Sequence, residues 1–87
     1  EVLAVGEKSM VTKMKYKPGD KVPFHSHPNE QNGYVIGGEY LLQYNGVNEI
    51  IQTGDSYSIQ ANIPHALEVI TAGEIIDVFT PPRPDYL

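Results

Sequence analysis

The chain of 87 residues contains no cysteine and no tryptophan. Without cysteine it forms no disulfide and offers no thiolate to a metal, so any metal site must use nitrogen and oxygen ligands. The absence of cysteine also fits a reducing compartment, and we expect a cytoplasmic location.

Basic residues are few, because 6 Lys and Arg stand against 11 Asp and Glu, for a formal net charge of -5. They form no cluster, so nucleic acid and anionic membranes are poor partners. No apolar run approaches the ~18 residues of a membrane-spanning helix, and no secretory signal is visible. The chain begins at Glu1 rather than Met, so we expect the natural protein to carry a few more N-terminal residues.

Sustained helical periodicity is also absent, so helices are expected to be absent or very short. Short runs rich in Val, Ile, Tyr, Leu and Thr instead alternate with turn signals built from Gly, Pro and Asn. Turns are predicted at 17–20, 37–38, 44–46, 53–55, 62–64 and 72–73. Strands are predicted at 2–5, 9–16, 22–26, 31–37, 39–44, 48–52, 56–59, 65–71 and 74–80. This pattern indicates an all-β single domain, a small barrel that closes on itself.

A domain this small buries only about 60–65% of the surface of its unfolded chain, so a bound metal, a homodimer interface or both should add stability. The barrel is predicted over residues 1–80. The tail, residues 81–87, holds three prolines and cannot continue a sheet. We expect an extended arm of the same domain, with Tyr86 and Leu87 as anchors on its own barrel or on a neighbouring subunit.

Two of the three histidines, His25 and His27, stand one residue apart. In a strand, residues i and i+2 point to the same face, which would place the two imidazoles side by side. Imidazole is the commonest protein ligand for transition metals. His65 lies far along the chain in a similar setting beside proline. These positions predict a metal site built from two β-segments, against the alternative of ordinary loop histidines.

The spacing around these histidines resembles the two motifs of the cupin superfamily. The first motif is matched by Gly19, His25, His27, Gln31 and Gly38, with Gln31 where a glutamate usually stands. The second motif is matched by Gly54 and His65, with departures at Gln60, Asn62 and Val69. The resemblance covers residues 15–80 and implies a double-stranded β-helix, or jelly-roll barrel.

The resemblance implies one divalent transition metal ion held by His25, His27, Gln31 and His65. Because glutamine is neutral, such a site would hold the metal less tightly and leave it a stronger Lewis acid. Nickel, zinc, iron, manganese and copper are all compatible with these ligands. Strand alternation places Gln31 on the face of His25 and His27, whereas a register slip at a bulge would bring in the adjacent Glu30 instead.

Asp77 is an acid within an otherwise apolar strand, where an unpaired carboxylate would cost several kcal/mol. One interpretation is an outward-facing acid paired with Arg83 or a lysine. We favour an inward carboxylate near the metal, able to act as a general acid or base, with Phe79 on the same face.

Arg83 follows two prolines, and two roles are open for it. It could cap the barrel mouth and bind a substrate carboxylate, or remain a solvated tail charge. The tyrosines are predicted to serve the core or a dimer interface rather than catalysis. They are Tyr16, Tyr34, Tyr40, Tyr44 and Tyr57.

The segments 25–35, 54–57 and 76–83 resemble the small cupins of pectin and alginate breakdown, the KdgF type. That resemblance implies an enzyme that opens unsaturated uronates to linear keto sugars without an organic cofactor. Its substrate is a small sugar acid, with Asp77 moving protons and Arg83 and Phe79 around the sugar. Two alternatives are a metal-dependent dioxygenase or isomerase on another small molecule, and a non-catalytic sugar-binding or sensing barrel.

Overall fold

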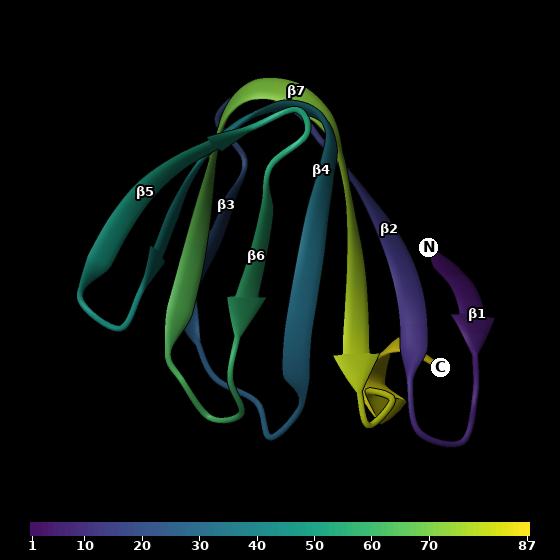
Figure 1. The fold of residues 1–87 in the computed structure, drawn as a ribbon. Helices are drawn as coiled ribbons and strands as arrows, with labels where there is room; N and C mark the ends of the chain where they lie inside the picture. The colour runs from purple at the N-terminus through teal and green to yellow at the C-terminus, as the bar shows by residue number, and fades with distance from the viewer.

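The computed structural model describes residues 1–87, which form an antiparallel β-structure ending in one 3-10 turn (Figure 1). The strands are β1 (Val2–Val5), β2 (Met10–Tyr16), β3 (Lys21–His25), β4 (Glu30–Tyr44), β5 (Val47–Gln52), β6 (Ser56–Ile59) and β7 (His65–Thr80). The predicted all-β jelly-roll architecture is confirmed. None of the helical structure has the length and apolar character that a membrane crossing requires.

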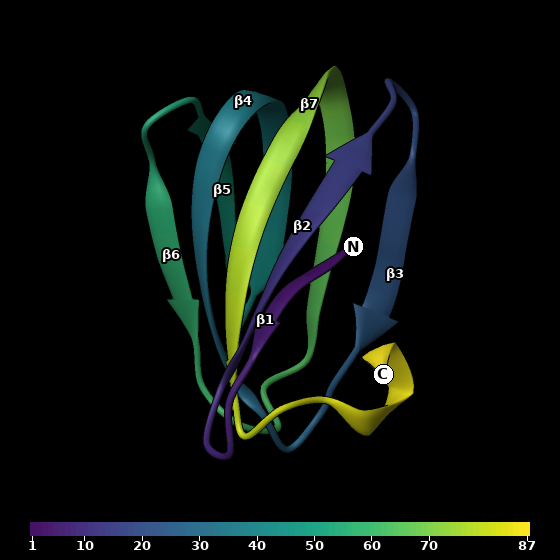
Figure 2. The same ribbon diagram turned by 90° about the vertical axis from the view of Figure 1, so that its right-hand side faces the viewer.

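The long strands β4 and β7 bend over at one end of the barrel, and each contributes to both of its walls (Figures 1 and 2). One wall joins β1, β2, the C-terminal half of β7, the N-terminal half of β4, and β6. The facing wall joins β3, the N-terminal half of β7, the C-terminal half of β4, and β5. Pairing between β4 and β7 therefore continues through the bend and connects the walls.

The prediction of turns at 37–38 and 72–73 is wrong, because the chain bends at these positions while its strands continue. The predicted strands 31–37 and 39–44 form the single β4, and 65–71 and 74–80 form the single β7. A Cβ atom on Gly73 would lie 1.9 Å from the carbonyl oxygen of Gly37. The glycines thus mark a close crossing of two backbones, which sequence punctuation does not distinguish from a turn.

We expect Gly73→Ala to lower the free energy of unfolding by about 3 kcal/mol, because its methyl group would overlap backbone that cannot move aside. Gly37→Ala is the matched control, since a Cβ atom there meets nothing within 4 Å. It should change stability by less than about 1 kcal/mol. Urea denaturation of both variants provides the measurement, and equal effects would contradict the steric argument.

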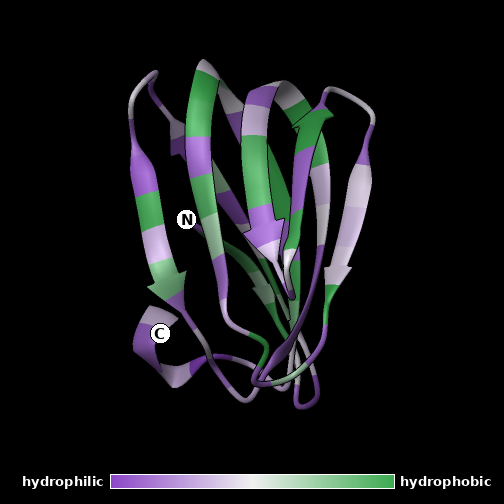
Figure 3. Cartoon of the chain, turned by 90° about the vertical axis from the view of Figure 1, so that its left-hand side faces the viewer, coloured by the Kyte–Doolittle hydropathy of each residue, from purple (hydrophilic) through white to green (hydrophobic).

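Most of the apolar core lies toward the bend, although Ile59 pairs with Gln31 nearer the other end of the barrel. Buried and exposed residues alternate along the first half of β4, and Figure 3 shows hydrophobic and hydrophilic bands along the strands. The core consists of Val35, Tyr40, Leu42, Ile51, Ile59, Leu67, Val69 and Ile75. Tyr40 thus belongs to the core as predicted, whereas Tyr34 is 52% exposed. Buried polar side chains gather toward the opposite end: His27, Asn29, Gln31, His65 and Asp77.

The prediction of an extended tail is wrong for its last residues, because Pro84–Tyr86 form the 3-10 turn η1. Figures 1 and 2 show this turn at the end of the barrel opposite the bend. The ring of Tyr86 packs edge-on against Phe79 at 5.5 Å between centroids, whereas Leu87 is 72% exposed. Tyr86 therefore anchors the tail on its own barrel.

Candidate metal and substrate site

The three histidines come together at the end of the barrel opposite the bend. His25 ends β3 and pairs in register with His65, the first residue of β7. The ring centroids lie 5.6 Å apart for His25 and His27, 4.2 Å for His25 and His65, and 4.9 Å for His27 and His65. One nitrogen from each ring lies within 4.8 Å of the others, so the three side chains could hold a metal ion.

His27 does not share a strand with His25, so the side-by-side arrangement that residues i and i+2 would have in a strand does not apply to this pair. β3 ends at His25, and His27 lies in the loop that follows. That loop is fixed by a backbone hydrogen bond from Asn62 to the carbonyl oxygen of His27, at 2.8 Å. The two rings therefore converge through loop geometry rather than through strand alternation.

All three imidazoles are oriented through Nδ1 by backbone carbonyl groups. The distances are 2.9 Å for His25, 2.9 Å for His27 and 2.8 Å for His65, and the acceptors are the carbonyl oxygens of Pro23, Asn29 and Ile63. A carbonyl oxygen only accepts, so Nδ1 of His25 and of His65 carries the proton and their Nε2 atoms keep a lone pair, whereas His27 faces an oxygen acceptor at each ring nitrogen. Metal-binding histidines are oriented in this way by their outer hydrogen bonds.

His65 provides the clearest test of whether these residues fit a metal. Its Nε2 is buried and has no hydrogen-bond partner. Burial lowers the pKa of His65, which favours the neutral ring. A buried acceptor without a partner costs about 1–3 kcal/mol, and a bound cation would satisfy it. The donor set therefore fits a divalent transition metal.

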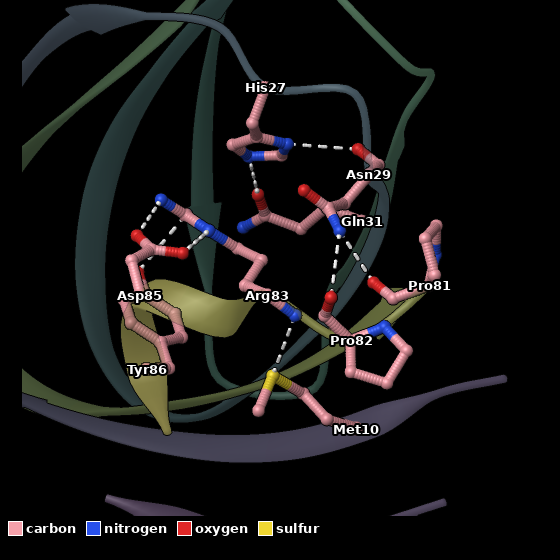
Figure 4. Close-up of polar contacts among 9 residues, drawn as sticks. All are labelled: Met10, His27, Asn29, Gln31, Pro81, Pro82, Arg83, Asp85 and Tyr86. Atoms are coloured by element: carbon pink, nitrogen blue, oxygen red, sulfur yellow. Dashed lines mark hydrogen bonds and ion pairs between the residues drawn. The ribbon is translucent and has the colours of Figure 1, made fainter. Parts of the chain in front are cut away.

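Gln31 is buried on β4, and its side chain lies beside His27 (Figure 4). Its Nε2 donates to Oδ1 of Asp77 at 3.0 Å, which turns its Oε1 toward Nε2 of His27 at 3.1 Å. An amide oxygen only accepts, so Nε2 of His27 is the donor in this hydrogen bond and would lose its proton on binding a cation. Glu30 is exposed on the other face of the strand, so the register slip that would have brought it inward does not occur.

Asp77 faces the interior, with 4% of its surface exposed, and the outward-facing interpretation is wrong. Its Oδ1 accepts hydrogen bonds from the Tyr57 hydroxyl at 2.6 Å and from Gln31 at 3.0 Å. Burial raises the pKa of Asp77, although the bonds from Tyr57 and Gln31 oppose the rise. A raised pKa brings the carboxyl group closer to the range in which it exchanges protons at neutral pH.

Tyr57 is the functional candidate that the sequence reasoning missed, since it was assigned to the core or a dimer interface. Burial and the charge on Asp77 raise the pKa of Tyr57 well above its usual value, so its hydroxyl remains a donor. A Cβ atom on Gly33 would lie 2.1 Å from the Tyr57 ring, so only glycine leaves room for this ring. The available signal was a glycine, Gly33, directly opposite Tyr57 on the adjacent strand. This signal can be recognised only when the register between β4 and β6 is known.

Tyr57→Phe should move the acid limb of any activity that depends on ionised Asp77 to higher pH. The hydroxyl of Tyr57 stabilises the carboxylate and so lowers the pKa of Asp77. Removing it raises that pKa, and the ionised form is then lost at a higher pH than in the wild type. The carboxyl pKa measured by NMR on the metal-free protein checks the change, and Tyr44→Phe, at an exposed hydrogen bond to Glu49, is the control. An unchanged Asp77 pKa would contradict the role given to Tyr57.

Phe79 and Arg83 complete the cavity that is lined by His25, His65 and Asp77. The other side chains with polar atoms in its lining are Tyr16, Gln31, Tyr57 and Tyr86. The Phe79 ring lies edge-on to His27 at 5.7 Å, and the guanidinium carbon of Arg83 lies 5.3 Å from the Phe79 centroid. The Arg83 side chain is only 14% exposed. The alternative that Arg83 is a solvated charge on the tail is therefore wrong.

Asn29 connects the histidine loop to the tail. Its backbone carbonyl orients His27, and its side-chain amide donates to the carbonyl oxygens of Pro81 at 2.6 Å and Pro82 at 3.4 Å (Figure 4). The residue is buried. The position of Arg83 is thereby coupled to the position of the His27 ring.

Comparison with known proteins gives one family and several relatives. The sequence profile of the Cupin domain family matches residues 12–79. The chain is 36% identical over 69 residues to the HTH-type transcriptional regulator PuuR of Escherichia coli, a match that covers 76% of the chain and 37% of that regulator. The chain therefore spans well under half the length of this curated relative.

Two solved structures superpose over the whole chain. An RmlC-like cupin from Shewanella frigidimarina has a TM-score of 0.96 at 29% identity, covering 100% of this chain and 78% of that one. KdgF from Halomonas sp. has a TM-score of 0.95 at 25% identity, covering 100% and 81% of the two chains. The architecture is thus that of known proteins.

Proposed function

The chain belongs to the cupin family, and we propose that it is a metal-dependent enzyme that opens unsaturated uronate monosaccharides to linear keto sugars. One observation carries the proposal. A buried carboxylate, Asp77, shares a cavity with His25 and His65, two members of the histidine cluster that could hold a metal, and with the largely buried side chain of Arg83. The likeness to KdgF supports the choice of substrate class.

In this proposal the metal ligands are His25, His27, His65 and Gln31. The carbonyl groups that hold each Nδ1 keep the three Nε2 atoms directed into one space. When bound, a divalent metal supplies Lewis-acid polarisation of substrate oxygens. Asp77 holds the Gln31 side chain in its orientation through a hydrogen bond. This bond directly connects a proposed metal ligand to the proposed proton carrier.

Asp77 is the proposed proton carrier. Ring opening of an unsaturated uronate is an isomerisation, in which the anomeric hydroxyl loses a proton, the bond from C1 to the ring oxygen breaks, and C4 gains a proton as the enol becomes a ketone. A single carboxylate can take the first proton and return one to C4. Tyr57 and Gln31 donate to the same oxygen of Asp77, Oδ1, which leaves Oδ2 free for the substrate.

Arg83 and Phe79 are the proposed substrate-binding residues. A guanidinium group binds a carboxylate through two parallel hydrogen bonds, which suits the acid group of a uronate. Phe79 offers an apolar ring between His27 and Arg83, against which a sugar face can pack.

The direct test uses the ultraviolet absorbance of the unsaturated uronate, whose double bond is conjugated with its carboxylate. Metal-loaded protein should abolish this absorbance, and protein treated with a chelator should leave it unchanged. A metal-loaded sample that leaves the absorbance intact would overturn the proposal.

A ligand-sensing module is the second candidate, and the identity with part of PuuR favours it. The same cavity would then bind a small molecule and report its presence to another part of a longer protein. This candidate predicts saturable ligand binding without turnover, and binding that survives Asp77→Asn.

A further inference from the structure

The fork of Arg83 that would bind a substrate carboxylate is already occupied by a carboxylate of the same chain. We propose that Asp85 competes with the ligand for Arg83, so that a carboxylate ligand binds by replacing Asp85. The identity of the ligand as a sugar acid rests on the function proposed above, whereas the competition itself rests on the tail geometry.

Asp85 holds one complete edge of the Arg83 guanidinium group (Figure 4). Nη2 donates to Oδ2 at 2.7 Å and Nε donates to Oδ1 at 3.2 Å. These two parallel bonds are the arrangement by which arginine recognises a free carboxylate. Nη1 donates to the Tyr86 hydroxyl at 3.2 Å, so most of the guanidinium surface is engaged within the tail.

The pair is asymmetric in its exposure to solvent. The Arg83 side chain is 14% exposed and lines the cavity, whereas the Asp85 side chain is 58% exposed. The guanidinium carbon lies 4.4 Å from the centroid of the Tyr86 ring, which holds Arg83 in place independently of Asp85. The hydrogen bond from Arg83 lowers the pKa of the Asp85 carboxyl group, so Asp85 is ionised at neutral pH.

Replacement of Asp85 does not require the tail to unfold. Ion pairs with an exposed partner are weak, because water solvates the released charge. The turn is also held by backbone bonds, from Tyr86 to Arg83 and from Leu87 to Pro84, each at 3.1 Å, and by packing of Tyr86 on Phe79. Asp85 therefore acts as a weak competitor that only a ligand with its own carboxylate displaces.

The test measures binding of D-galacturonate to the metal-loaded chain by calorimetry, because this saturated uronate lacks the double bond that ring opening consumes. Asp85→Asn keeps the shape of the side chain and removes its charge. We expect its Kd for D-galacturonate to be about two- to fivefold lower than that of the wild type, the range of a weak surface ion pair. Its Kd for neutral D-galactose should not change.

Two controls separate competition from a general change in charge. Glu68→Gln removes one exposed negative charge elsewhere on β7 and should leave both Kd values unchanged. In an Arg83→Gln background, Asp85→Asn should have no further effect, since the competed group is gone.

Weaker binding of D-galacturonate by Asp85→Asn would overturn the proposal and show that Asp85 orients Arg83 for its ligand. Unchanged binding, or no binding by any of the variants, would also overturn it. Failure of the ring-opening assay is a separate outcome, because galacturonate binding requires no turnover.

Discussion

His65→Ala should weaken metal binding at least about a hundredfold, because it removes a ligand rather than one of the outer contacts, whose loss alone costs about 10- to 100-fold. His65 is the histidine whose Nε2 is buried without a partner, and burial lowers its pKa, so its lone pair is available to a cation. Metal content after dialysis, measured by elemental analysis, together with titration of the metal-free protein, gives the affinity.

A comparison of thermal stability separates loss of the ligand from damage to the fold. Wild type and His65→Ala should melt at similar temperatures in the presence of a chelator and diverge when metal is added, since a ligand stabilises only the state that binds it. Gln60→Ala, at an exposed position in the preceding loop, is the control and should bind metal normally. Full metal stoichiometry in His65→Ala would remove this residue from the proposed site.

Asp77→Asn should lower kcat for ring opening by about 10²- to 10⁴-fold, the range that general acid–base catalysis contributes. Asparagine retains an oxygen that can accept the hydrogen bonds from Tyr57 and Gln31, so the cavity should keep its shape. It cannot accept a proton at neutral pH. Steady-state kinetics by loss of ultraviolet absorbance measures the change.

The metal content of Asp77→Asn should stay at the wild-type level, which distinguishes loss of a base from loss of the metal. Asp20→Asn, an exposed turn residue, is the matched control and should retain full activity. Undiminished kcat in Asp77→Asn would remove the proposed proton carrier, and ligand binding without any turnover in the wild type would favour the sensing module.

The sequence predicted those parts of the site that depend on local alternation and motif spacing. Gln31 faces inward because β4 alternates regularly from that residue. The convergence of His25 with His65 followed from the resemblance of both motifs, since only knowledge of a fold says that two distant segments pair. His27 reaches the same place from the loop after β3, so its position does not follow from the alternation of side chains along a strand.

Features that depend on tertiary approach could not be predicted. Tyr57 enters the site because Gly33 on the neighbouring strand leaves room for its ring, a relation visible only once the register is known. The pairing of Arg83 with Asp85 depends on a 3-10 turn, where prolines had indicated an extended arm. In both cases the local residues permit several arrangements, and packing against a distant segment selects one.

The bend of β7 has a consequence for how mutational data on this protein should be interpreted. His65 and Asp77 lie on the two halves of the same strand, and the bend at Gly73 places those halves in opposite walls. Any change that straightens the strand would separate the histidines from the carboxylate. A screen for lost activity should therefore recover substitutions at Gly73 alongside substitutions in the cavity, although Gly73 does not line the cavity. Assays of expression and folding would be needed to recognise such positions as architectural.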